Sequence, residues 1–191
     1  MQSLVSSASE NAFQRGIYAA MLVVRGTILT TANQLDAAIS KLEQGRAIYE
    51  SLSKTGATNI ANVAASDVKL GEAAAKAGHD QKAAEYFHRA LMTAEHLISI
   101  EPADPDALYA AADAYFGLGE LSMKKARLAS TSLDQQRSHW NEARSWYQQS
   151  SDTWRRIQHP NHTAPNSFQV GDPNIVAKQL KFAEAVLASI H

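Results

Sequence analysis

One pattern of small and large residues occurs three times along the chain, and it constrains the fold more than any other feature. Each copy begins with a glycine in a helical context, at Gly26, Gly71 and Gly119. A small residue, a large residue and a second small residue follow. They are Ala38, Leu42 and Gly45 in the first copy, Ala83, Phe87 and Ala90 in the second, and Ala143, Tyr147 and Ser150 in the third. The first two copies are offset by 45 residues at all four positions, which predicts a repeated structural unit.

Each unit is expected to be a pair of antiparallel helices joined by a turn. Glycine inside a helix costs about 1 kcal/mol relative to alanine, so three glycines in comparable places indicate a packing requirement. Small residues let two helices approach closely, and the large residue fills the space between them. One pair leaves an apolar face uncovered, so the pairs are expected to stack. The third copy is offset by 48 residues at its glycine and 60 elsewhere, which predicts a 12-residue insertion at about 124–137.

Composition favours an all-α protein of about seven helices. Of the 191 residues 45% are hydrophobic and 19% are charged, and the 9 glycines and 5 prolines are few. Stretches of helical periodicity separate the breaking residues, and no segment alternates polar and apolar residues with the period of a strand. The expected helices span 9–32, 35–54, 59–77, 80–99, 105–128, 133–158 and 173–190.

Helix-start signals support these boundaries. Ser7 with Glu10 and Ser132 with Gln135 have the spacing of capping boxes. An Asp-Pro pair at 104–105 and another at 172–173 place an N-cap before a first-turn proline. We therefore expect a single domain. Its parts are repeats at about 12–54, 59–100 and 105–158, a loop at 159–171 and an amphipathic capping helix at 173–190.

The repeat resembles the tetratricopeptide repeat (TPR) family over about residues 12–158. The second copy carries Leu70-Gly71, Ala74, Gly78, Ala83, Phe87 and Ala90, and the third carries Tyr115, Leu118-Gly119, Ser122, Ala143, Tyr147 and Ser150. The resemblance implies a right-handed helix-turn-helix solenoid, or α-α superhelix. The family's standard repeat has about 34 residues. A 45-residue period is similar to elongated arrays attached to bacterial serine/threonine kinases and cyclases.

In that family the first helices of successive repeats line a concave groove. The resemblance therefore implies a scaffold, or a sensor or regulatory part of a signalling protein, that binds a partner protein or peptide there. Val23, Val68 and Phe116 would form an apolar floor with polar edges. Two glutamates precede lysines by four residues, so neutralisation within the chain is the alternative to ligand contact. The candidate groove residues are Val23, Thr27, Val68, Glu72, Lys76, Asp113, Phe116, Glu120 and Lys124.

The sixth expected helix offers a second candidate surface. Trp140, Tyr147 and Trp154 lie seven residues apart and so share one helix face. Packing of this face against the capping helix is the favoured interpretation. The alternative is an exposed aromatic patch through which the chain self-associates as a structural helical homodimer.

The sequence carries no complete pattern for catalysis, a metal or a cofactor. It has no cysteine, no His-Glu-x-x-His, no Gly-x-Ser-x-Gly, no phosphate-binding loop and no dinucleotide fingerprint. Glu85 and His88 form half of a di-iron motif without a second copy, which favours a surface pair. His159 and His162 are the other weak metal candidates. We expect a protein that is not an enzyme and holds no cofactor or metal.

Charge and hydropathy restrict the binding partners and the cellular location expected for the chain. A net charge of −1 argues against nucleic-acid or membrane-surface binding. The apolar stretch at 16–24 is too short to span a bilayer and predicts a buried helix segment. A cytoplasmic protein is expected.

Overall fold

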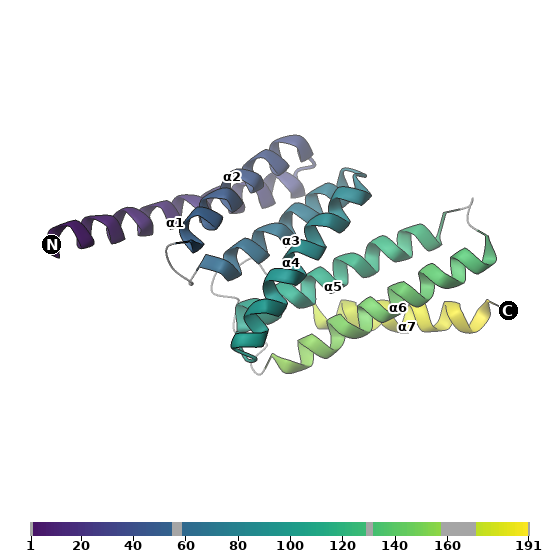
Figure 1. The fold of residues 1–191 in the computed structure, drawn as a ribbon. Coiled ribbons are helices and arrows are strands. Elements are labelled where there is room, and N and C mark those ends of the chain that lie inside the picture. Colours follow the sequence, from purple (N-terminus) through teal and green to yellow (C-terminus); the bar gives the residue numbers. More distant parts are fainter. Residues whose placement is uncertain (1, 55–58, 129–131, 158–170, 191) are drawn as a thin grey trace.

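The computed structural model describes residues 2–54, 59–128, 132–157 and 171–190, and these residues form seven α-helices (Figure 1). The helices are α1 (Gln2–Thr31), α2 (Leu35–Ser53), α3 (Ile60–Lys76), α4 (Asp80–Ile100), α5 (Pro105–Ala126), α6 (Leu133–Arg156) and α7 (Pro173–Ser189). The all-α class is confirmed. Every expected boundary is met within two residues except one, because α1 begins at Gln2. The Ser7–Glu10 capping box is therefore wrong, since both residues lie inside α1.

Three of the expected helix caps are confirmed. The Ser132 hydroxyl accepts a hydrogen bond from the Gln135 N–H at 3.3 Å, and the Gln135 side chain accepts one from the Ser132 N–H at 3.1 Å. Asp104 accepts from the Ala107 N–H at 3.0 Å, and Asp172 caps α7 in the same manner. These side chains satisfy N–H groups that have no partner within the helix.

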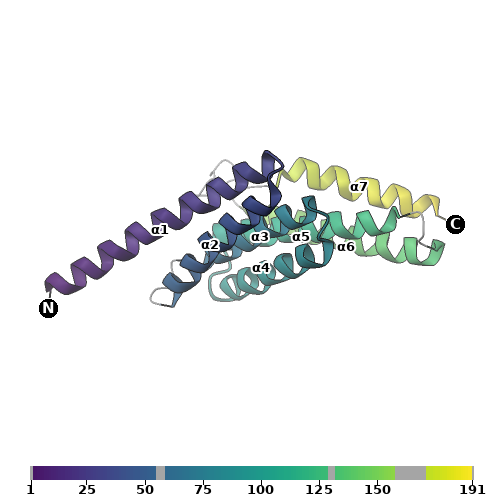
Figure 2. The ribbon, with the colours of Figure 1, turned by 90° about the horizontal axis from the view of Figure 1, so that it is seen from above.

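The helices pack in sequence, as three consecutive pairs followed by α7 (Figures 1 and 2). The pairs are α1 with α2, α3 with α4 and α5 with α6, and α7 packs against α6. In addition α3 contacts both α1 and α5, so the first helices of the three pairs lie alongside one another.

In all three pairs the glycine of the repeat lies against the large residue of the facing helix, as the pattern predicts. A Cβ atom added to Gly71 would lie 2.6 Å from the Phe87 ring, and one added to Gly119 would lie 2.6 Å from the Tyr147 ring. At Gly26 the nearest atom, Cγ of Leu42, would be 2.5 Å away. No side chain fits at these distances, so each glycine is required by the close approach of its two helices.

The turns of the first two pairs repeat as well. Asn33 and Gly78, 45 residues apart, both adopt positive φ, at 61° and 79°. The following N–H group in each turn bonds back over five residues, from Gln34 to the Leu29 carbonyl and from His79 to the Ala74 carbonyl, both at 2.9 Å. This is the hydrogen bond of a Schellman helix end. The 45-residue offset between the first two copies thus holds for the backbone hydrogen bonds of their turns as well.

The expected insertion in the third pair lies mostly in helix. α6 begins ten residues before Ala143, whereas α4 begins only three residues before the equivalent Ala83. α5 likewise continues two residues further past Gly119 than α3 does past Gly71. The insertion therefore lengthens the third pair, and α7 packs against this pair.

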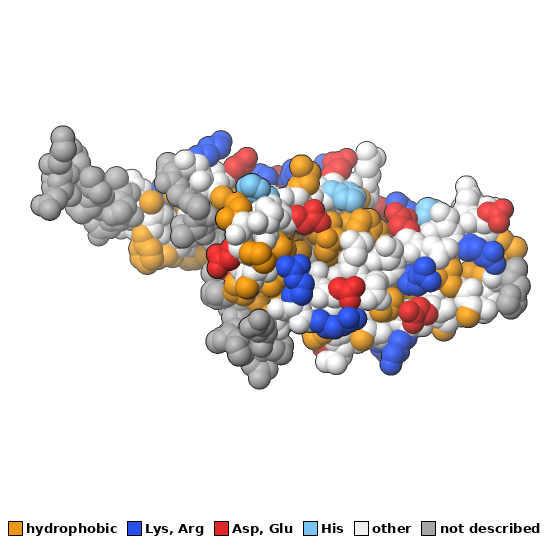
Figure 3. All heavy atoms as spheres, turned by 60° about the horizontal axis from the view of Figure 1, so that its bottom comes forward, with side chains coloured by type: hydrophobic (Ala, Val, Ile, Leu, Met, Phe, Trp, Pro, Cys, Tyr) orange, Lys and Arg blue, Asp and Glu red, His pale blue; other side chains and the backbone are white. Residues whose placement is uncertain are grey.

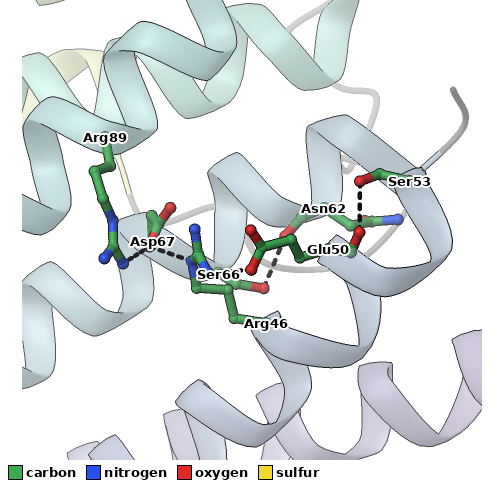
Figure 4. A network of polar contacts seen from close by, with 7 residues as sticks. All are labelled: Arg46, Glu50, Ser53, Asn62, Ser66, Asp67 and Arg89. Carbon is green, nitrogen blue, oxygen red and sulfur yellow. Dashed lines mark hydrogen bonds and ion pairs between the residues drawn. The ribbon is translucent and has the colours of Figure 1, made fainter.

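A buried carboxylate links the first two pairs (Figure 4). Asp67 of α3 is fully buried, and its Oδ1 accepts a hydrogen bond from Arg46 Nε of α2 at 2.8 Å and another from Arg89 of α4. Arg46 also pairs with Glu50 at 2.9 Å. Burial raises the pKa of Asp67, and the two guanidinium groups oppose that rise.

The apolar stretch at 16–24 is only partly buried. Ala19, Leu22 and Val23 lie in the core, but Ile17 and Met21 are exposed. The expectation of a buried segment is wrong for the four exposed residues among these nine, because α1 packs against α2 and α3 on one side and has no helix on its opposite side among the described residues. None of the helices in the described ranges is long and apolar enough to cross a membrane.

Candidate functional site

Two adjoining pockets lie along α3 and α5. The smaller, of about 210 Å³, is lined by Glu72, Ala75, Phe87, Asp113, Phe116, Gly117 and Glu120. The larger, of about 410 Å³, shares Ala75 and Glu120 and continues past Lys124 to Arg127 and Leu128. We call the two together the α3–α5 groove. Five of the nine groove residues expected from the sequence line it, namely Glu72, Asp113, Phe116, Glu120 and Lys124.

The other four expected groove residues lie elsewhere. Val23 and Val68 are 0% and 2% exposed, so they belong to the core and form no open apolar floor. The Thr27 hydroxyl donates to the Val23 carbonyl at 3.0 Å. Lys76 Nζ donates to the Thr30 carbonyl at 2.7 Å, where it caps the last turn of α1. These four residues lie where the first two helix pairs pack against each other.

Glu72 is a groove acid whose pKa is raised by its surroundings. Its Oε2 lies 3.4 Å from Nζ of Lys69, a lysine that is itself almost fully buried. Burial raises the pKa of Glu72 to about 7; Lys69 opposes this rise, and the neighbouring charge of Asp113 adds to it. Near neutral pH, Glu72 is therefore present in both its protonated and its ionised form.

Glu120 is held by a buried phenol. The Tyr147 hydroxyl donates to Glu120 Oε1 at 2.7 Å, and burial together with this carboxylate raises the pKa of Tyr147 above its usual range. The phenol thus stays protonated and fixes one oxygen of Glu120. Lys124 pairs with Asp80 at 2.6 Å, not with Glu120. The i,i+4 pairs considered in the sequence therefore do not form, because the side chains take other partners.

The aromatic face of α6 is packed inside the molecule. Trp140, Tyr147 and Trp154 are all buried. The Trp140 ring meets Phe182 of α7 edge to face, with centroids 5.7 Å apart. The favoured interpretation, packing on the capping helix, is confirmed. These three side chains therefore do not form the exposed patch of the alternative.

The remaining metal candidates gain no support from geometry. The His88 ring lies edge-on to Trp146, with centroids 6.1 Å apart, and Glu85 is hydrogen-bonded to Gln81. In the described part of the chain, no three acidic or histidine side chains are placed to hold a metal ion. His159 and His162 lie outside the described residues, as does most of the loop expected at 159–171.

Replacing Glu72 with glutamine is expected to change how stability depends on pH. The folded-state pKa of about 7 exceeds the ordinary value of 4.5, so the ionised side chain costs stability as pH rises through this interval. Relative to the wild type, the free energy of unfolding of Glu72→Gln should increase by about 2 kcal/mol between pH 5 and pH 8. Urea unfolding at both pH values measures this difference. Parallel pH profiles would show that Glu72 titrates normally.

Several groove residues escaped the sequence analysis. Ala75 and Gly117 line the small pocket, where a large residue would fill the space. A single alanine or glycine in a helix does not by itself indicate a pocket. Lys69, which pairs with Glu72 and lines neither pocket, also escaped it, because it stands at a position that hydrophobic periodicity assigns to the helix interior. Comparison of the chain with protein-family models, with curated proteins and with solved structures finds no match, so the tetratricopeptide resemblance stays a prediction.

Proposed function

We propose that this protein is a non-catalytic interaction module that binds a partner peptide along the α3–α5 groove. A lysine or arginine side chain of the peptide occupies the small pocket. The observation that carries the proposal is the lining of that pocket, where Glu72, Asp113 and Glu120 surround the same space as Phe116.

The chemistry of the pocket suits a cationic side chain. Carboxylates form their strongest hydrogen bonds with ammonium and guanidinium groups, and aromatic ring faces attract cations. Phe116 and Phe87 supply two rings beside the three acids. A volume of about 210 Å³ is below the range of about 300–1,000 Å³ typical of small-molecule sites and fits one side chain. The larger pocket beside it leaves room for the rest of the peptide.

The arrangement of the chain is, in this proposal, a TPR-like right-handed solenoid with a concave peptide-binding face. Its support is the glycine contact shared by the three helix pairs and the adjacency of α1, α3 and α5. A scaffold or a regulatory part of a bacterial signalling protein in the cytoplasm is the role that this architecture favours. Peptides commonly lie along the first helices of such repeats.

The test is selection from a displayed library of random peptides that lack histidine, followed by affinity measurement on the best binder. We expect lysine or arginine at one fixed position. Ionised Glu72 strengthens the attraction, so Kd should be roughly tenfold lower at pH 8 than at pH 6. Glu72→Gln should remove this pH dependence while leaving Asp113, Glu120 and Lys69 in place.

A pocket-filling variant gives a second readout. Ala75→Leu occupies the space shared by both pockets and should abolish peptide binding. Ala47→Leu, an exposed alanine of α2 outside the groove, is the matched control and should bind as the wild type does. Enrichment of acidic or purely apolar peptides, or equal binding by Ala75→Leu and Ala47→Leu, would refute the proposal.

A further inference from the structure

Helix α1 has two opposite apolar faces. One face packs on α2 through Ala19, Leu22 and Gly26, which are buried. The opposite face carries five large apolar side chains that are 44% to 69% exposed. They are Phe13, Ile17, Met21, Val24 and Ile28. At 100° per residue these five fall within an arc of about 80°, and we call them the α1 stripe.

The α1 stripe is large for a surface exposed to water. Five or six side chains that each expose on the order of 100 Å² give about 500–600 Å², the upper end for a patch on a monomer. Tyr18, also exposed, flanks the stripe. Hydrophobic side chains gather next to the N-terminal segment on the face shown in Figure 3, whereas charged side chains are scattered over much of the rest of that face.

The repeat shows what this face does in the other pairs. The equivalent residues of α3, offset by 45, are Asn62, Ser66, Lys69 and Ala73, and those of α5 are Ala110, Ala114, Gly117 and Leu121. Most of them are buried, and each helix packs against the preceding pair. The same face of α1 has no preceding pair among the described residues. The α1 stripe is thus a stacking face without its partner.

The sizes of these residues argue against stacking of another pair of the same kind. The equivalent face of α5 is built from alanine, glycine and a single leucine, which lets it approach α3 and α4 closely. The α1 stripe has phenylalanine, methionine, valine and two isoleucines instead. Large residues at these spacings fit a wider helix-to-helix seam, in which side chains of both helices interdigitate.

We propose that two copies of this chain pair through the α1 stripe, with the two α1 helices antiparallel. The stripe is nearly symmetric about the point between residues 20 and 21. Antiparallel pairing around that point places Phe13 level with Ile28 of the second copy and Ile17 level with Val24, and the two copies of Met21 lie within about 1.5 Å of each other along the axis. With both copies counted, the interface buries about 1,000–1,200 Å² in total, which reaches the minimum of about 1,000 Å² for a biological interface and fits a weak, reversible dimer.

Charge favours the antiparallel orientation. Between Phe13 and Ile28, Arg25 is the charged residue that borders the α1 stripe, because Arg15 lies on the side of α1 that faces α2 and donates a hydrogen bond to the Ser51 hydroxyl at 3.1 Å. Parallel pairing sets Arg25 level with Arg25 of the second copy. Antiparallel pairing moves the two copies of Arg25 apart by about 14 Å along the axis, because the helix rises 1.5 Å per residue. It also places each Arg25 level with uncharged residues of the other helix. This pairing is independent of the peptide proposed for the α3–α5 groove.

Sedimentation equilibrium of the intact chain tests the pairing. We expect a reversible dimer with Kd in the micromolar range. Ile17→Glu/Met21→Glu should raise that Kd by roughly 100-fold, because it places charges at the centre of the seam. Both residues are exposed in the single chain, so folding should be unaffected, which circular dichroism checks. Met92→Glu, an equally exposed methionine on α4, is the control and should dimerise as the wild type does.

Cross-linking tests the orientation, and the absence of natural cysteines makes it clean. Met21→Cys should form a disulfide-linked dimer under mild oxidation, because the two copies of position 21 face each other. Ile28→Cys should not, since its counterpart lies about 20 Å away in the antiparallel register. A monomer at all concentrations, or a dimer unaffected by Ile17→Glu/Met21→Glu, overturns the proposal. Equal cross-linking at both positions overturns the antiparallel arrangement.

Discussion

Replacing Phe87 with alanine is expected to lower the free energy of unfolding by about 4 kcal/mol. The ring is 2% exposed and lies between Gly71 of α3 and Gly117 of α5. A Cβ atom added to either glycine would lie within 2.6 Å of the ring, so both positions must be glycine for the ring to fit. Loss of the ring opens a cavity bordered by three helices. Two glycines cannot fill that space, so relaxation recovers little. Urea unfolding followed by circular dichroism measures the change.

Met92→Ala is the matched control for this prediction. It removes a large apolar side chain from the same helix at a position that is 73% exposed, and it should change stability by less than about 0.5 kcal/mol. A loss below about 1 kcal/mol for Phe87→Ala would mean that α3 and α5 close over the vacant space. In that case the three helices would not be held apart by this ring.

The seven helices and their sequential packing could be predicted because they depend on a local pattern of small and large residues that occurs three times in the sequence. Glycine opposite a large residue fixes the distance between two helices, and short turns fix which helices pair. The turns are fixed locally as well. Asn33 and Gly78 stand at turn positions with positive φ, a conformation that asparagine and glycine tolerate better than other residues. The start of α1 was missed because a capping box at Ser7 is only a preference, and nothing in that pattern prevents the helix from beginning earlier.

The site could be predicted only in part because helix periodicity does not say which face meets which neighbour. Val68 and Phe116 hold equivalent positions in the second and third pairs, yet Val68 is buried and Phe116 lines a pocket. α7 packs beside the third pair alone, and α1 lies beside the second, so equivalent residues meet different surroundings. The α1 stripe did have a signal, since a helix with apolar residues on opposite faces needs two partners.

The carboxylate of Asp67 had no such signal, and it carries the second large effect. We expect Arg46→Met/Arg89→Met to destabilise the protein by about 3–5 kcal/mol at pH 7, because a fully buried carboxylate loses both of its cationic partners. Methionine keeps much of the apolar stem of arginine, so the loss reports the charge rather than the packing. Urea unfolding of the single and double variants measures it.

Adding Asp67→Asn to the double variant separates charge from shape. Asparagine keeps the size of the side chain and removes the buried charge, so about half or more of the loss should return. The pH dependence gives the same separation. Burial already raises the pKa of Asp67 and the arginines oppose that rise, so without them the carboxyl protonates at a higher pH. The double variant should therefore regain stability as pH falls, whereas the triple variant should not. A loss that is independent of pH and of Asp67→Asn would assign the effect of the two arginines to packing alone.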